Sequence, residues 1–66
     1  MKIGDRVGFK KYTEGKGTIV KVQKAEDSWP RITRYAVQAA HKSAVLDREL
    51  NCMVVWVEAG HIWAAD

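Results

Sequence analysis

The sequence predicts a mainly β fold, either a small five-stranded barrel or a rolled antiparallel sheet. Three observations favour it: the chain has only 66 residues, apolar and polar residues alternate over short runs, and glycines separate those runs without a long helical pattern. A chain of this length allows one domain, residues 1–66, with a small core. A four-stranded antiparallel sheet covered by one short helix is the alternative.

The first strand is expected at residues 6–12, where Val7 and Phe9 share one face and polar residues occupy the other. Gly8 inside this run indicates a bulge or a close approach of backbone. Residues 12–17 follow as a turn or loop, because their two glycines supply backbone angles that other residues resist.

The second strand is expected at residues 18–24 and the third at residues 32–39, since both runs are rich in β-branched or aromatic residues. Residues 25–31 connect them as a loop, because Pro30 cannot donate a hydrogen bond to a central ladder.

Residues 53–57 form the clearest strand, and we expect it to be central because both of its faces are apolar. Gly60 then turns the chain. Residues 61–63 would close the barrel as a last short strand or a helical turn.

The segment at residues 43–50 allows two interpretations. Leu46 and Leu50 are four residues apart, which favours a short helical turn. The alternative is the rest of a long hairpin with its turn at residues 47–49. We prefer the helical turn at this point.

Charge is unevenly distributed. Residues 1–34 carry nine Lys or Arg and four Asp or Glu, a net charge of +5. Residues 35–66 carry two Lys or Arg and four Asp or Glu, a net charge of −2. The two halves together give the overall net charge of +3. A basic half attracts nucleic acid or acidic protein surfaces, although lysines also keep small β proteins soluble. The candidate basic surface comprises Lys10, Lys11, Lys16, Lys21 and Lys24, joined by Arg31 and Arg34.

Cysteine usage and the start of the chain suggest a reducing compartment. Cys52 is the sole cysteine, so no disulfide forms within one chain. The sequence does not open with the apolar run of a signal peptide. Residues 52–57 are too few to span a bilayer. We therefore expect a cytoplasmic protein without membrane attachment.

No motif indicates catalysis. Gly15-Lys16-Gly17 resembles part of a phosphate loop, but Lys10 stands where that motif needs glycine, and Gly17 stands where it needs Ser or Thr. Acidic residues at 26–27 and 47–49 are expected to be solvated surface groups. A carboxylate pair does acid–base chemistry only where a site separates the two pKa values.

A metal site is not expected either. His41, Cys52 and His61 are separated by eleven and nine residues, which matches no zinc pattern. A thiol at the start of an apolar strand behaves as a small hydrophobic group. We expect no cofactor, no metal and no enzymatic activity.

The aromatic residues suggest a binding surface. Tyr12 and Trp29 lie in expected loops near Arg31 and Arg34, and exposed aromatic rings beside arginine are typical of peptide grooves and base-stacking surfaces. Alternatively, Trp29 folds back as a plug in the barrel mouth, because a small core needs its large side chains. Trp63 would cover the open end of the barrel.

Three segments resemble the SH3-like barrel superfamily: Gly4-Asp5-Arg6-Val7, the Gly-Lys-Gly-Thr-Ile-Val at residues 15–20, and the Tyr-Ala-Val at residues 35–37. That group includes KOW and Tudor-type modules and the plasmid-borne type II dihydrofolate reductases. The resemblance implies a small barrel and covers most of the chain.

The comparison with the reductases has more local detail. Residues 35–41 are similar to the third strand of that family, which builds its active pore from a Val-Gln-Ile-Tyr-Pro stretch. Residues 54–58 of this chain read Val-Val-Trp-Val-Glu instead, and an extra stretch intervenes near residues 41–51. The resemblance therefore implies the barrel without the catalysis. The size of the single module also suits a phage or mobile-element accessory protein.

Three functions follow from these observations, in order of preference. The first is a non-catalytic binding module that contacts another protein or itself, with a homodimer as one form. The second is nucleic-acid binding through the basic first half. The third is an oligomeric reductase resembling the type II enzymes.

Overall fold

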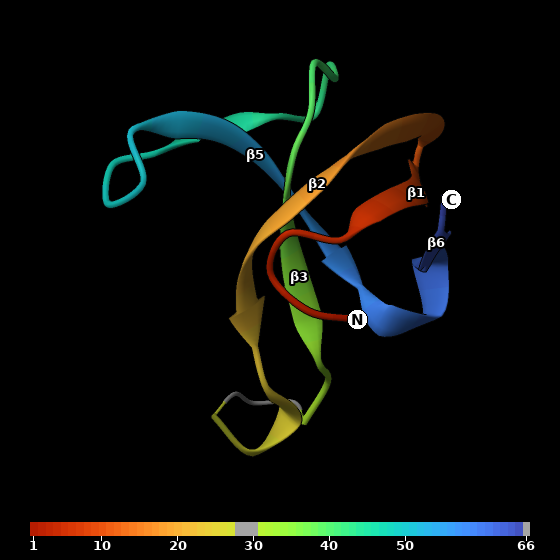
Figure 1. The fold of residues 1–66 in the computed structure, drawn as a ribbon, viewed down its shortest axis with the longest axis vertical. Coiled ribbons are helices and arrows are strands. Elements are labelled where there is room, and N and C mark those ends of the chain that lie inside the picture. Colours follow the sequence, from red (N-terminus) through yellow and green to blue (C-terminus); the bar gives the residue numbers. More distant parts are fainter. Residues whose placement is uncertain (28–30, 66) are drawn as a thin grey trace.

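The computed structural model describes residues 1–27 and 31–65 (Figure 1). Within these residues the chain forms six antiparallel strands in one sheet, in the order β4-β5-β3-β2-β1-β6. The elements are β1 (Arg6–Lys11), β2 (Thr13–Gln23), the 3-10 turn η1 (Ala25–Asp27), β3 (Arg34–Gln38), β4 (Val45–Asp47), β5 (Cys52–Glu58), the 3-10 turn η2 (Ala59–His61) and β6 (Ile62–Ala64). The mainly β prediction is confirmed, with six strands rather than five in the described part.

The loop expected at residues 12–17 is wrong. β1 and β2 form a tight hairpin in which Lys10 lies opposite Glu14, so the turn is confined to the residues around Tyr12. Tyr12 has a φ of 68°, the left-handed conformation that such a short connection needs. The two glycines of the expected loop therefore lie inside β2.

Gly15 and Gly17 are required for close packing rather than for a turn. A β-carbon at Gly15 would lie 2.6 Å from Cζ of Phe9, and one at Gly17 would lie 2.8 Å from Cγ1 of Val37 and would also meet the carbonyl oxygen of Gln38. Register explains the crowding, because Gly15 lies opposite the core residue Phe9. These glycines leave space for the side chains of the core.

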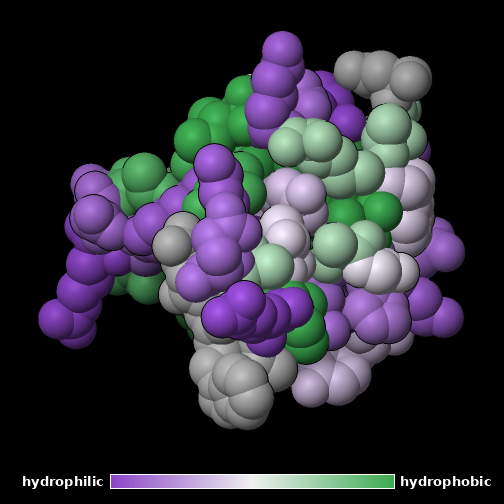
Figure 2. Space-filling view, turned by 90° about the horizontal axis from the view of Figure 1, so that it is seen from below, coloured by the Kyte–Doolittle hydropathy of each residue, from purple (hydrophilic) through white to green (hydrophobic). Residues whose placement is uncertain are grey.

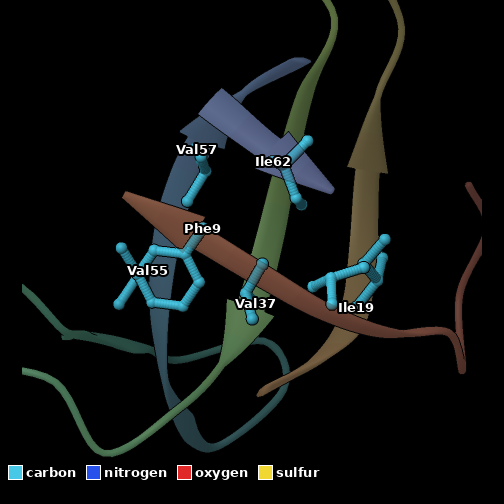
Figure 3. Packing of buried hydrophobic residues seen from close by; sticks show 7 residues of the cluster. Phe9, Ile19, Val37, Val55, Val57 and Ile62 are labelled. Carbon is cyan, nitrogen blue, oxygen red and sulfur yellow. The ribbon is translucent and has the colours of Figure 1, made fainter. Parts of the chain in front are cut away.

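The core lies where the curled sheet brings β1 across β3 and β5, as Figure 3 shows. Side chains from five strands point toward one another there. They are Val7, Phe9, Ile19, Val37, Val55, Val57 and Ile62. The alternation of Val7 and Phe9 in β1 is confirmed. At Gly8, where a bulge or a close backbone approach is expected, β1 keeps its register and the indole side chain of Trp63 lies against the glycine.

The segment at residues 43–50 is a hairpin arm, and the preferred helical turn is wrong. β4 pairs with β5, with Val45 opposite Val54 and Leu46 opposite Met53. Asp47 shapes the turn that follows, because its Oδ1 accepts hydrogen bonds from the backbone N–H groups of Glu49 and Leu50, each 3.0 Å long. These bonds close the turn between β4 and β5.

β5 is flanked on both sides by strands, as expected of a run that is apolar on both faces. Val54 and Val55, which point to opposite faces, are both fully buried. The chain then makes the η2 turn around Gly60 and returns as β6, which pairs with β1. In Figure 1 the β4–β5 hairpin and β6 lie at opposite sides of the molecule.

Candidate binding surfaces

The residues of the candidate basic surface do not form one continuous surface in the structure, and two of the lysines bond to other parts of the chain. Lys11 points across the fold, where its Nζ donates a 2.8 Å hydrogen bond to the carbonyl oxygen of Trp56. Lys21 forms a 2.6 Å ion pair with Glu49 in the turn after β4. The hydrogen bond to Glu49 raises the pKa of the Lys21 ammonium. Both lysines are therefore engaged within the chain.

The remaining basic residues lie on different parts of the surface. Lys10 and Lys16 are exposed on the outer face of the β1–β2 hairpin. Lys24 is exposed beyond the end of β2, and Arg31 is exposed before β3. Arg34, at the start of β3, is half-buried and lies opposite Glu58 in the sheet.

The expected aromatic patch of Tyr12, Trp29, Arg31 and Arg34 stays a prediction. Tyr12 is 82% exposed at the β1–β2 turn, whereas Arg31 and Arg34 flank the connection into β3. Trp29 lies outside the described residues. The exposure of Tyr12 leaves its ring accessible to a partner.

Trp63 lies on the outer face of the sheet rather than over the barrel mouth. It is opposite Gly8 in the β1–β6 pairing, and Gly8 is opposite Lys16 in the β1–β2 pairing, so the three positions form one row across the sheet. A β-carbon at position 8 would lie 2.7 Å from Cε2 of the indole. Trp63 nevertheless remains 44% exposed. Sequence reasoning missed this pairing, because only the strand register brings Gly8 and Trp63 together.

A second surface missed by sequence reasoning is apolar. Its four residues, Val45, Leu46, Leu50 and Met53, are between 40% and 56% exposed. They belong to β4, β5 and the intervening turn, with Val45 on the opposite face of β4 from Leu46, and we call them the hairpin patch. A shallow hollow of about 440 Å³, lined by Gln38, Ala39, Ala40 and Met53, borders it. Figure 2 shows apolar atoms among hydrophilic ones on the left, the side where Figure 1 places this hairpin.

An open cleft lies between the end of β1 and the end of β5. It has a volume of about 280 Å³ and is lined by Lys10, Lys11, Tyr12, Trp56, Val57, Glu58 and His61. This volume is below the roughly 300–1,000 Å³ usual for small-molecule sites. Lys11 already donates to Trp56 here, and the lining holds two lysines and one glutamate, a formal excess of one positive charge.

His41 has a structural role. Its ring packs edge-on against Phe9 with a centroid distance of 5.2 Å. Nδ1 accepts a 3.0 Å hydrogen bond from the N–H of Ser43, so Nε2 carries the proton and donates to the Thr13 carbonyl oxygen at 3.1 Å. The described residues contain no group of three or more His, Cys, Asp or Glu placed to hold a metal ion.

No family model, curated protein or solved structure matches this chain. Within residues 1–27 and 31–65, no helix is long and apolar enough to cross a membrane. The surfaces described above are therefore the basis for a functional proposal.

Proposed function

We propose that this chain is a small, non-catalytic binding module with an SH3-like barrel, and that it acts through protein–protein contact at the hairpin patch. Its partner in this proposal is a second copy of the chain. Strands β1, β2, β3, β5 and β6 form a curled sheet that is compatible with such a barrel, and β4 extends the sheet at one edge. This extension carries two of the four exposed apolar side chains used in the proposal.

The observation that carries the proposal is that one hairpin exposes four apolar side chains, of which Leu46 and Met53 share a face and Val45 lies on the opposite face of β4. Single exposed hydrophobic residues are normal on protein surfaces, but contiguous ones mark interaction sites. Leu46 and Met53 are direct neighbours in the β4–β5 register. A small core also benefits from self-association, because a chain of this size buries little apolar surface alone.

The position of β4 favours a second copy over an unrelated protein. β4 ends the sheet, so its outer edge can pair with another strand. Antiparallel pairing of two β4 strands requires a two-fold axis perpendicular to the sheet, which keeps each face continuous between copies. Centring the axis on Leu46 places this leucine opposite its symmetry mate, with Met53 of each copy beside it.

Local charge is compatible with this pairing. Lys42 and Arg48 are balanced by Asp47 and Glu49, so the segment around β4 has no formal net charge. The positive excess of the chain belongs to residues 1–34 instead. Two copies that meet at β4 would therefore avoid the like-charge repulsion that opposes association elsewhere on the surface.

Oligomeric state tests the proposal. Multi-angle light scattering over a concentration series should give a dimer for the wild-type chain. Leu46→Glu should give a monomer, because it would place two carboxylates opposite each other at the axis. Ile3→Glu is the matched control, since Ile3 is also an exposed aliphatic residue but lies outside the hairpin.

Each outcome decides the proposal, provided that circular dichroism shows the three chains folded. A dimer for the wild-type chain and Ile3→Glu, but not for Leu46→Glu, supports it. A wild-type chain that stays monomeric at every concentration overturns it. So does a dimer that is insensitive to Leu46→Glu.

A further inference from the structure

The outer face of β6, β1 and β2 carries an exposed indole and basic side chains, which have no part in self-association at β4. Its centre is Trp63, whose indole lies against the backbone of Gly8 and remains 44% exposed. Residues of β1 that alternate with the buried Val7 and Phe9 must lie on this same outer face. They are Arg6, Gly8 and Lys10.

The cations around Trp63 are available to a ligand. Lys16 lies opposite Gly8, so it and Trp63 flank the glycine from the two neighbouring strands. Arg6 and Lys10 lie two residues before and after Gly8 on β1, about 7 Å away in each direction. All three side chains are exposed, and no ion pair engages them in the described part of the chain.

We propose that this face, comprising Arg6, Gly8, Lys10, Lys16 and Trp63, binds single-stranded nucleic acid. The exposed indole would stack on an unpaired base, and the three cations would neutralise neighbouring phosphates. Glycine at position 8 is part of the site, because any side chain there would displace the ring. Glu14 lies opposite Lys10 in the β1–β2 pairing.

The observations favour nucleic acid over an acidic protein, and single strands over duplex. An acidic peptide would use the cations, whereas an unpaired base would also stack on the flat face of the indole between them. The bases of a duplex are paired and stacked, so one ring on an open sheet face cannot reach them. This inference is independent of the proposed dimer, since β6 and β4 are the two opposite edges of the sheet.

The test is fluorescence anisotropy of a short labelled oligothymidylate titrated with the chain at low and at moderate salt. Trp63→Leu should weaken binding at least about fivefold, the lower bound expected for one stacked base. Trp63→Phe keeps an aromatic ring and should retain most of the affinity. Lys16→Gln should reduce the slope of log K against log salt by about 0.7.

Lys24→Gln is the matched control, because it removes the same charge from the far end of β2. It should change affinity less than Lys16→Gln. Leu46→Glu should bind the short oligonucleotide as the wild-type chain does, which separates this inference from the proposed dimer. Circular dichroism establishes that each variant is folded before its affinity is compared.

Several results would overturn the inference. They are the absence of binding at low salt, equal binding by Trp63→Leu and the wild-type chain, and equal effects of Lys16→Gln and Lys24→Gln. The last result would indicate diffuse attraction by the basic half. Tighter binding of a mixed-sequence duplex, or of polyglutamate, would assign this face to another class of partner.

Discussion

The indole of Trp63 occupies the space above Gly8 that a β-carbon at position 8 would enter. Gly8→Ala should therefore push the ring from its place and destabilise the fold by about 1 kcal/mol, the lower end of the range for overpacking, because a partly exposed side chain can move. Urea denaturation monitored by circular dichroism measures this difference. Gly60→Ala is the control, since nothing lies within 4 Å of a β-carbon there, and its effect should stay within about 0.5 kcal/mol.

Gly17→Ala should be the most damaging of these glycine substitutions. The added methyl group would meet the backbone carbonyl of Gln38, Cγ1 of Val37 at 2.8 Å and Cβ of Ala39 at 2.9 Å. Backbone inside a sheet cannot move as a surface indole can, so we expect a loss of about 3 kcal/mol or more. The same denaturation series gives the ranking of positions 17, 8 and 60. A Gly17→Ala chain as stable as the wild type would contradict this account of β2.

Tyr12→Asn should stabilise the chain. Tyr12 has a φ of 68°, and a bulky side chain in this conformation costs about 1 kcal/mol or more, whereas asparagine tolerates it. Little packing is lost, because Tyr12 is largely exposed. Thermal unfolding should show a higher Tm for Tyr12→Asn and a lower one for Tyr12→Val, whose branched side chain resists this conformation further. An unchanged or lower Tm for Tyr12→Asn would mean that the ring itself contributes stability.

The Lys21–Glu49 ion pair should contribute weakly and should be sensitive to salt. Both side chains are substantially exposed, so solvent and ions screen their attraction. A double-mutant cycle with Lys21→Met and Glu49→Gln should give a coupling that shrinks as NaCl rises. A coupling that is unchanged at high salt would contradict this account.

The same pair predicts the direction of a pH effect. Glu49 raises the pKa of Lys21 in the folded chain, so the pair stabilises the fold fully below the ordinary lysine pKa of about 10.4. Its contribution should disappear as the pH rises through the higher value of the folded state. Comparing the wild-type chain with Glu49→Gln from neutral to alkaline pH checks this. A difference in stability that persists at the most alkaline pH would contradict the assignment.

The strands were predictable where side-chain alternation is enough to define them. Val7 and Phe9 in β1, and Val54, Val55 and Val57 in the doubly apolar β5, are buried as that pattern requires. The β1–β2 connection was not predicted, because a glycine can serve either a turn or a close contact. Choosing between these for Gly15 requires knowing that Phe9 lies opposite it.

The binding surfaces were less predictable than the strands. The spacing of Leu46 and Leu50 suits a helix as well as a hairpin. The pairing of β4 with β5 decides in favour of the hairpin. Trp63 and Gly8 stand at opposite ends of the sequence, and only the return of β6 makes them neighbours. The lysines could be counted from the sequence, but the partners that engage Lys11 and Lys21 could not.

The return of β6 to β1 also has a consequence for the order of folding. Strands β1, β2 and β3 are joined in sequence and pair with their neighbours, so their contacts close short loops. Pairing of β6 with β1 must close nearly the whole chain, which costs more entropy and delays its formation. In refolding experiments on a variant in which Trp63 is the sole tryptophan, its fluorescence should therefore change in the final kinetic phase. The circular dichroism of the sheet formed by β1, β2 and β3 should change earlier.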